Sequence, residues 1–374
     1  MRAILCGGGT GGHINPAIAI AKKICKEEPG SEILFCGGVG GLEERLVPRE
    51  GFRLETFDIK GFRRKLDPKS ILYNFKVLKK AVTSQSKAKK VIRDFKPDIV
   101  IGCGGYASYP VMKQAQSMKV PTAVLEVNVL PGVTTKVLAA HADLMMLGFT
   151  ETKKYFDSFK GKMLVTGNPI RADILDADRE TARKELGLDG RPLIVSVWGS
   201  LGAEQMNRQM ADFIALEAKE DRHHLIHAIG GHGYAWLPDL IASKGVDLSK
   251  HQNIEVRDYI YDMARVLAAA DLVLCRAGAA TLAELAVIGK PCIIVPSPNV
   301  AENHQEKNAR ALEQAGGAVV ILEKDSTGEL LYKEACRLLA SPDTLAKMSE
   351  NMKKRGQADA IDQIYTALKS ILPA

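Results

Sequence analysis

The chain has 374 residues, of which 46% are apolar and 25% charged, the composition of an ordinary globular protein with two domains. No run approaches the roughly 20 apolar residues that a membrane-spanning helix needs, and the first strand leads directly into a glycine loop, unlike a secretory signal. The seven cysteines form no CxxC pair, which argues against a zinc site or a disulfide framework.

The formal charge of +7 is unevenly distributed along the chain. Residues 1–169 contain 27 Lys/Arg and 15 Asp/Glu, whereas the remainder contains 24 and 29. Residues 60–96 alone contain 13 basic and two acidic side chains. The first half therefore contains a surface suited to an anionic partner.

Apolar strand-like runs alternate with helical patterns along the whole chain. In the first half, strands are expected at 2–6, 33–36, 53–58, 98–102, 121–126, 143–147 and 162–165, with helices at 15–28, 69–95 and 108–118. After a break at 166–169, further strands are expected at 192–197, 224–228, 253–256, 271–275, 291–295 and 317–321, and a helical tail from 342. This alternation predicts two α/β domains with parallel sheets covered on both faces.

The first strand runs into five glycines, Thr10 and His13 within residues 7–13, and a helix follows. Such a loop brings backbone N–H groups and the positive end of a helix dipole close to a polar, phosphate-bearing ligand. His13 is a candidate general base, although it could also cap the helix. The dinucleotide fingerprint is matched too, but strand 33–36 ends in Gly37-Gly38-Val39 without the acid that holds a ribose, which disfavours a nicotinamide oxidoreductase.

Other motifs repeat this plan of a strand, a polar turn and a helix. In the first half they are Gly104-Gly105-Tyr106-Ala107-Ser108 and Glu126-Val127-Asn128. In the second half, the Gly199–Gly202 turn suits a diphosphate, and Glu284 could accept two ribose hydroxyls. The amides of His304-Gln305-x-x-Asn308 could line a sugar pocket. Each of these residues could equally serve as a turn or cap residue, or face solvent.

Residues 60–82 combine basic side chains with apolar ones at helical spacing. The apolar stripe is formed by Ile71, Phe75, Leu78 and Val82. This pattern predicts a surface for anionic lipid. Nucleic acid is the rival partner of such a basic segment, but no aromatic platform or nucleic-acid motif accompanies it, so no nucleic-acid partner is expected.

Taken in order, these motifs resemble those of the MurG family, which transfers N-acetylglucosamine (GlcNAc) from UDP-GlcNAc to lipid I and so makes lipid II for peptidoglycan synthesis. The resemblance covers nearly the whole chain. It implies an α/β protein of the GT-B fold, with two Rossmann-like parallel-sheet domains facing across a cleft, inversion at the anomeric carbon and no metal or other cofactor. It also implies a peripheral location at the cytoplasmic face of the cell membrane.

The resemblance further implies how the two domains and their residues divide the substrates. The acceptor- and membrane-binding domain would comprise residues 1–168 and a final helix at about 357–374, and the UDP-GlcNAc domain residues 169–356. His13 would be the base on the 4-hydroxyl of MurNAc. The acceptor would be bound by Gly9, Gly104, Gly105, Tyr106, Ser108 and Glu126. The donor would be bound by Thr10, Gly11, Gly12, Asn128, Arg171, Ser200, Ile260, Arg276, Gly278, Thr281, Glu284, His304, Gln305 and Asn308.

Three positions depart from the family pattern, since Leu201, Val127 and His304 each stand where the family usually has glutamine. Two alternatives therefore remain open at this point. One is a related UDP-sugar transferase with another lipid acceptor, such as diacylglycerol. The other is a UDP-GlcNAc epimerase, which shares the two-domain plan.

Overall fold

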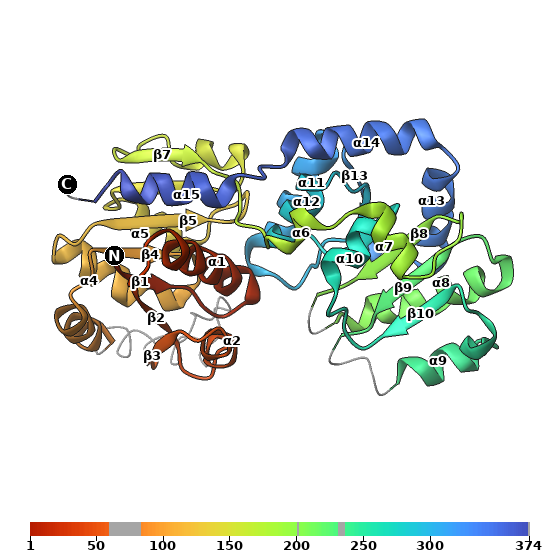
Figure 1. Ribbon diagram of the computed structural model, residues 1–374, viewed down its shortest axis with the longest axis horizontal. Helices are drawn as coiled ribbons and strands as arrows, with labels where there is room; N and C mark the ends of the chain where they lie inside the picture. The colour runs from red at the N-terminus through yellow and green to blue at the C-terminus, as the bar shows by residue number, and fades with distance from the viewer. Residues whose placement is uncertain (60–83, 200–201, 231–235, 373–374) are drawn as a thin grey trace. The chain divides into compact units, whose positions relative to one another are not determined.

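A computed structural model describes residues 1–59, 84–199, 202–230 and 236–372. The chain divides into two compact units (Figure 1): unit 1 is Met1–Ile170 with Asp359–Ala374, and unit 2 is Arg171–Ala358. The basic segment 60–82, Ser200 and Leu201 lie outside the described residues. Within the described part of the chain, no helix has both the length and the apolar character needed to cross a membrane.

Unit 1 contains a seven-stranded parallel sheet in the order β3-β2-β1-β4-β5-β6-β7. Its strands are β1 (Arg2–Cys6), β2 (Glu32–Gly38), β3 (Arg53–Phe57), β4 (Ile99–Gly102), β5 (Thr122–Glu126), β6 (Leu144–Leu147) and β7 (Lys162–Val165). In the centre, Ile4 pairs with Leu34 of β2 and Val100 of β4. The predicted strands of this half are confirmed, because central strands that are buried on both faces have nearly continuous apolar sequences.

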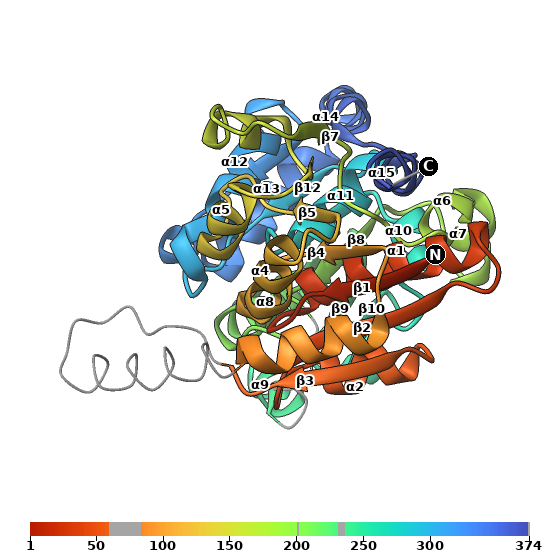
Figure 2. The same cartoon turned by 90° about the vertical axis from the view of Figure 1, so that its left-hand side faces the viewer.

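Helices cover both faces of this sheet (Figures 1 and 2). They are α1 (Gly11–Glu27), α2 (Glu43–Arg49), α4 (Tyr109–Ser117), α5 (Val133–Ala139) and α15 (Ala360–Lys369), with 3₁₀ turns η1 (Tyr106–Ser108) and η2 (Thr150–Tyr155). Of the helix predicted over 69–95, residues 84–95 are helical and the rest lies largely outside the described residues. Residues 84–95 pack with α4 and α5 against one side of the sheet, and α15 contacts α1.

Unit 2 contains a six-stranded parallel sheet in the order β10-β9-β8-β11-β12-β13. Its strands are β8 (Leu193–Val197), β9 (His224–Ala228), β10 (Ile254–Arg257), β11 (Leu272–Cys275), β12 (Cys292–Ile294) and β13 (Ala318–Val320). Its helical elements are α6 (Asp173–Asp176), α7 (Arg179–Glu185), α8 (Glu204–Glu220), α9 (Leu237–Ser243), η3 (Leu248–Lys250), α10 (Met263–Ala269), α11 (Ala279–Val287), η4 (Ala301–Asn303), α12 (His304–Gln314), η5 (Glu323–Asp325), α13 (Gly328–Leu339) and α14 (Pro342–Arg355). Two apolar cores, one on each face of the sheet, confirm the predicted α/β layering.

The tail is not one continuous helix, contrary to the expectation from residue 342 onward. It breaks after α14 at Gly356 and resumes in α15. A Cβ atom on Gly356 would lie 2.6 Å from the Cα atom of Val287 in α11, so the chain passes too close to α11 for a larger residue. As a result, α14 belongs to unit 2 and α15 to unit 1.

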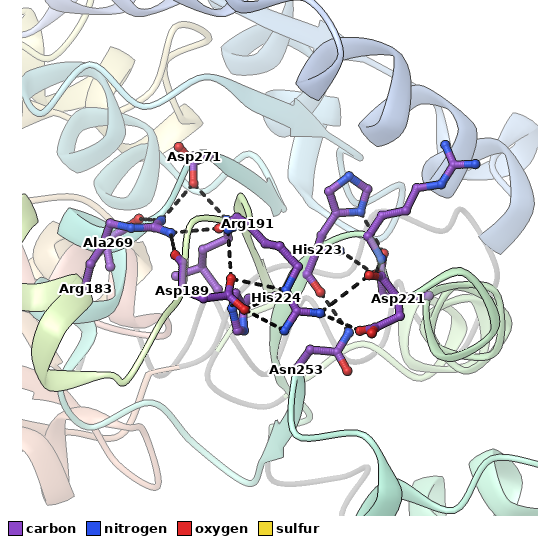
Figure 3. Close-up of polar contacts among 12 residues, drawn as sticks. Arg183, Asp189, Arg191, Asp221, His223, His224, Asn253, Ala269 and Asp271 are labelled. Atoms are coloured by element: carbon purple, nitrogen blue, oxygen red, sulfur yellow. Dashed lines mark hydrogen bonds and ion pairs between the residues drawn. The ribbon is translucent and has the colours of Figure 1, made fainter.

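The amino ends of the strands in unit 2 are joined by a polar network (Figure 3). Arg183 donates to the Ala269 carbonyl at 3.3 Å and to Asp271 at 3.1 Å. Arg191 pairs with Asp189 at 2.9 Å and with Asp221 at 2.6 Å. These contacts stabilise the edge of the sheet opposite the carboxyl ends of the strands, where ligands bind in such folds.

The helix α15 is attached to unit 1 by a cluster of polar contacts around Glu28. The carboxylate of Glu28 accepts hydrogen bonds from Lys369 Nζ at 2.8 Å and from Tyr365 Oη at 2.9 Å. The Lys369 ammonium is the main cause that lowers the pKa of Glu28 to about 2. Because the pKa is lowered on folding, ionised Glu28 stabilises the fold above its ordinary pKa, and this contribution is lost as the pH falls toward 2.

We therefore expect Glu28→Gln to lower the free energy of unfolding by about 1 kcal/mol near neutral pH, the upper range for a partly exposed ion pair. The difference from the parent protein should shrink as the pH is lowered below about 4. Urea denaturation at a series of pH values measures both effects. A difference that stays constant across the series would contradict this role of Glu28.

Candidate active site

The predicted motifs lie at two topological switch points. The strand order reverses between β1 and β4 in unit 1 and between β8 and β11 in unit 2. Ligands of open α/β sheets bind outside the carboxyl ends of the strands at such points. The loops that follow these four strands carry the glycine turns at 7–12, 103–108, 199–202 and 276–278.

His13 lies in the first turn of α1, directly after the glycine loop. Its Nδ1 atom lies 3.2 Å from the carbonyl oxygen of Gly8 and 3.3 Å from Thr10 Oγ1. A carbonyl oxygen only accepts hydrogen bonds, so Nδ1 carries the hydrogen and donates it to Gly8. In the neutral ring the lone pair is then on Nε2, the form that a general base requires.

Gly104 and Gly105 form the wall against which the imidazole packs. Both have positive φ angles, +98° and +81°. A Cβ atom on Gly104 would lie 2.7 Å from His13 Cδ2, and one on Gly105 would lie 2.4 Å from the Gly8 carbonyl oxygen. Only glycine fits both the backbone conformation and the close approach. These two residues therefore fix the position of the His13 ring.

The other predicted acceptor residues differ in how accessible they are. Tyr106 is exposed, and its Cε1 atom lies 3.4 Å from where a Cβ on Gly9 would be, so its ring lies beside the glycine loop. Ser108 is buried, and its hydroxyl donates to the Gly104 carbonyl at 2.7 Å. The Tyr106 ring is thus partly exposed beside the glycine loop, whereas Ser108 holds the turn after β4.

Glu126 ends β5 and is buried. Its carboxylate accepts the backbone N–H groups of Asn128 at 3.0 Å and Gly132 at 3.1 Å, and the Asn128 side-chain amide at 3.3 Å. Burial raises the pKa of Glu126, although these hydrogen bonds oppose the rise. Its carboxylate oxygens thus bind the backbone of the 127–132 loop, in line with the turn role that the sequence left open as the alternative to ligand binding.

Thr10, Gly11 and Gly12 lie at the N-terminus of α1. The first N–H groups of a helix have no acceptor within the helix, and the dipole is positive at this end. With His13 one residue further on, unit 1 brings together the N–H groups of a helix N-terminus and a candidate base.

In unit 2, the structure brings Glu284 and Arg171 together. Arg171 Nε donates to Glu284 Oε1 at 3.0 Å. The Glu284 side chain is only 14% exposed, and burial raises its pKa, while Arg171 acts in the opposite direction. Glu284 lies in α11, whose N-cap is Gly278 and whose first turn contains Thr281. An acidic and a basic side chain thus lie side by side in unit 2, with Glu284 in the second turn of α11.

The side-chain amides of Gln305 and Asn308 in α12 form hydrogen bonds within unit 2. Gln305 Oε1 accepts the N–H groups of Ala277 at 3.2 Å and Ser297 at 2.9 Å. The buried Asn308 donates to the Ala277 carbonyl at 3.2 Å. His304 is the first residue of α12. These contacts hold the turn after β11 in place beside the start of α12.

The remaining predicted donor residues also have defined places in unit 2. The guanidinium of Arg276 donates to the Val295 carbonyl at 3.0 Å and pairs with Glu323, so Arg276 joins three loops. The Ile260 side chain is buried. Gly202 has a φ of +75°, and a Cβ there would lie 2.2 Å from the Ile229 carbonyl oxygen. Ser200, another predicted donor residue, lies outside the described residues.

One residue at the glycine loop escaped prediction from the sequence. Glu43 is completely buried, and its carboxylate accepts the N–H groups of Gly38 at 2.7 Å and Gly9 at 3.2 Å. The dinucleotide fingerprint places an acid at the end of the second strand, whereas this one comes from the start of α2. The available signal was an acid shortly after a glycine-rich stretch, with glycines at 37, 38, 40 and 41.

Comparison with known proteins agrees with the two-domain α/β fold and with the glycine-rich loops that follow its strands. Residues 3–147 match the glycosyltransferase family 28 N-terminal domain, and residues 193–364 match the glycosyltransferase family 28 C-terminal domain. The chain belongs to glycosyltransferase family 28, whose GT-B fold has two parallel-sheet domains.

Individual relatives match over the full length. A UDP-N-acetylglucosamine--N-acetylmuramyl-(pentapeptide) pyrophosphoryl-undecaprenol N-acetylglucosamine transferase of Acetivibrio thermocellus is 46% identical over 373 residues, covering 100% of this chain and 98% of its own. The protein of the same name from Clostridioides difficile is 39% identical over 374 residues, covering 99% and 89%.

Solved structures agree in fold. Acinetobacter baumannii MurG is 25% identical, with a TM-score of 0.76 and coverage of 99% of both chains. A UDP-GlcNAc 2-epimerase from Neisseria meningitidis has a TM-score of 0.67 at 15% identity, covering 99% of this chain and 100% of its own. At that identity the epimerase likeness concerns the fold alone.

The contact between Gly104 and His13 gives a direct test of the site. In Gly104→Ala the new Cβ would push on the imidazole, so glycosyl transfer should fall about tenfold or more through misplacement of the ring. Gly51→Ala is the matched control, because Gly51 has a φ of +80° but a Cβ atom there would meet no atom within 4 Å.

Both variants should lose about 1 kcal/mol of stability from the strained backbone, and only Gly104→Ala should lose turnover. Steady-state kinetics and thermal unfolding measure the two properties. Equal turnover in the two variants would contradict the placement of His13.

Proposed function

We propose that this protein is an inverting N-acetylglucosaminyltransferase that moves GlcNAc from UDP-GlcNAc to the 4-hydroxyl of MurNAc in lipid I, the undecaprenyl-pyrophosphoryl acceptor, to give lipid II. The single observation that carries the proposal is His13, fixed by the Gly8 carbonyl and the Gly104-Gly105 wall with its lone pair on Nε2. Support also comes from relatives that bear this activity in their names and match over 98% and 89% of their own length.

Inversion requires a single displacement at the anomeric carbon. His13 Nε2 takes the proton of the acceptor hydroxyl as its oxygen forms the new bond to that carbon. The bond from the carbon to the diphosphate oxygen breaks, and UDP leaves with the electron pair. General base catalysis of this kind contributes about 10²–10⁴-fold to a rate.

The departing diphosphate needs positive charge and N–H donors aimed at it. Arg171 and the N-terminal turn of α11, with Gly278 and Thr281, supply these in unit 2. Glu284 binds the ribose hydroxyls, and the backbone at Ile260 meets the uracil. Because Arg171 and Glu284 pair with each other at 3.0 Å, each holds the other in position for the nucleotide.

On the acceptor side, the glycine loop and the Tyr106 ring form the surface beside His13. The helix N-terminus at Gly11 and Gly12 is suited to a phosphate group of either substrate. The anionic inner leaflet would hold the enzyme through residues 60–82, which places it peripherally at the cytoplasmic face of the membrane.

Incubation with labelled UDP-GlcNAc and a lipid I analogue tests the reaction. Labelled lipid II analogue should form, and His13→Ala should lower kcat by about 10²–10⁴-fold with the fold intact. Transfer to diacylglycerol but not to the analogue, or consumption of UDP-GlcNAc without any acceptor, would replace the proposal by one of its two alternatives. A loss below about threefold in His13→Ala would reject the base role.

Vesicle binding tests the membrane surface separately. Neutralising Lys76, Lys79 and Lys80 should weaken binding to anionic vesicles about tenfold or more, because each contributes on the order of 1 kcal/mol near such a surface. Turnover of a soluble acceptor analogue should stay unchanged. The control neutralises three exposed lysines of unit 2, Lys324, Lys333 and Lys347, with the same change in net charge. Equal weakening in both triple variants would contradict a specific role for residues 60–82.

A further inference from the structure

We propose that Glu43 is a positioning residue for His13, acting through the peptide group between Gly8 and Gly9. The inference rests on the proposed function, because it concerns the orientation and protonation of the base. Glu43 does not touch the reacting atoms; it holds the backbone that holds the imidazole.

Glu43 is a buried acid whose carboxylate binds two backbone N–H groups. Its side chain is completely buried at the start of α2. Oε1 accepts the Gly38 N–H at 2.7 Å and Oε2 accepts the Gly9 N–H at 3.2 Å. A carboxylate removed from water is costly unless hydrogen bonds satisfy it. Here one donor is the last residue of β2 and the other lies in the turn after the neighbouring strand β1, so the carboxylate joins these two segments.

The glycines around Glu43 leave room for its carboxylate. A Cβ atom would lie 2.3 Å from Oε1 if placed on Gly8, 2.5 Å from Cγ if placed on Gly37, and 2.3 Å from Oε2 if placed on Gly41. None of these three glycines has a φ in the left-handed region. Space, rather than backbone conformation, therefore requires glycine at these positions. Part of the glycine richness of this region is thus explained by Glu43.

The link to His13 is a single planar peptide group. Gly9 N–H and Gly8 C=O belong to the same peptide bond, which rotates only as a rigid unit. Its N–H end is bound by Glu43 and its C=O end accepts from His13 Nδ1 at 3.2 Å. Hydrogen bonds in such a chain polarise one another, so the carboxylate makes the Gly8 oxygen a stronger acceptor. Glu43 thereby favours the form of His13 that has its hydrogen on Nδ1 and its lone pair on Nε2.

The variant Glu43→Gln keeps the size of the side chain but gives one end of it N–H donors in place of an acceptor. It can no longer accept from both Gly9 and Gly38. We expect the His13 tautomers to become mixed and kcat to fall about 10–100-fold, the range known for residues that orient metal-binding histidines through a hydrogen bond to the ring. The KM for UDP-GlcNAc should stay within about twofold, because Glu284 and Arg171 lie in the other unit.

Glu44→Gln is the matched control. Glu44 is the next residue of α2, is exposed, and accepts the Gly40 N–H at 3.1 Å, so the control makes the same chemical change beside the same loop. The test combines steady-state kinetics with ¹⁵N NMR of histidine-labelled protein, in which long-range couplings distinguish the two ring nitrogens. The spectrum of His13→Ala assigns the His13 signal among those of the eight histidines.

The outcomes separate this proposal from the proposed function. If His13→Ala loses turnover while Glu43→Gln matches Glu44→Gln in kcat and tautomer, the role of Glu43 is overturned and the base role stands. If His13→Ala keeps its turnover, the base role fails. In that case the NMR spectrum alone tests the role of Glu43. A changed His13 tautomer in Glu43→Gln supports it, and an unchanged tautomer overturns it.

A second variant keeps the test decisive if Glu43→Gln does not fold. Gly41→Ala leaves Glu43 in place but displaces its carboxylate with a new methyl group. It should show the same mixed tautomers and reduced kcat. Gly190→Ala, where a Cβ meets no atom within 4 Å, is its control. Parental values in Gly41→Ala, with Glu43→Gln unfolded, would overturn the proposal.

Discussion

The peptide group between Gly8 and Gly9 is bound at both ends, its N–H by the buried carboxylate of Glu43 and its carbonyl by His13 Nδ1. A peptide bond cannot bend to satisfy one partner alone, so these contacts fix the turn after β1 as one unit. The Gly104-Gly105 backbone then closes on the other side of the imidazole. The position of His13 in unit 1 thus depends on backbone groups, one of which the Glu43 side chain holds in place.

In unit 2 as well, polar side chains bind backbone groups and so fix the loops that follow the strands. Gln305 and Asn308 bind the backbone of Ala277, and Arg276 joins the loops at Val295 and Glu323. In the same unit, the largely buried carboxylate of Glu284 in α11 pairs with the half-exposed guanidinium of Arg171. In the proposed function, unit 2 binds the nucleotide and unit 1 supplies the base.

The strands were predictable because central parallel strands are buried on both faces and have apolar sequences, as Ile4 and Val100 illustrate. The motifs were predictable because glycine turns follow those strands. The helical pattern from residue 342 did not reveal the break at Gly356, because the break depends on a close approach to Val287 in another helix. The family resemblance, by contrast, implied a separate final helix from about residue 357. Glu43 was missed for a related reason, since its task arises only when β2 pairs with β1 and brings Gly38 beside Gly9. The internal roles of Glu126 and Gln305 likewise depend on loop conformations that residue type alone does not reveal.

Calorimetric titration of UDP tests this division of labour between the units most directly. We expect Glu284→Ala to weaken UDP binding by about 10–100-fold, the loss of hydrogen bonds to a charged group. His13→Ala should leave the Kd of UDP within about twofold. Equal weakening in the two variants, or an unchanged Kd in Glu284→Ala, would contradict the assignment of the nucleotide to unit 2.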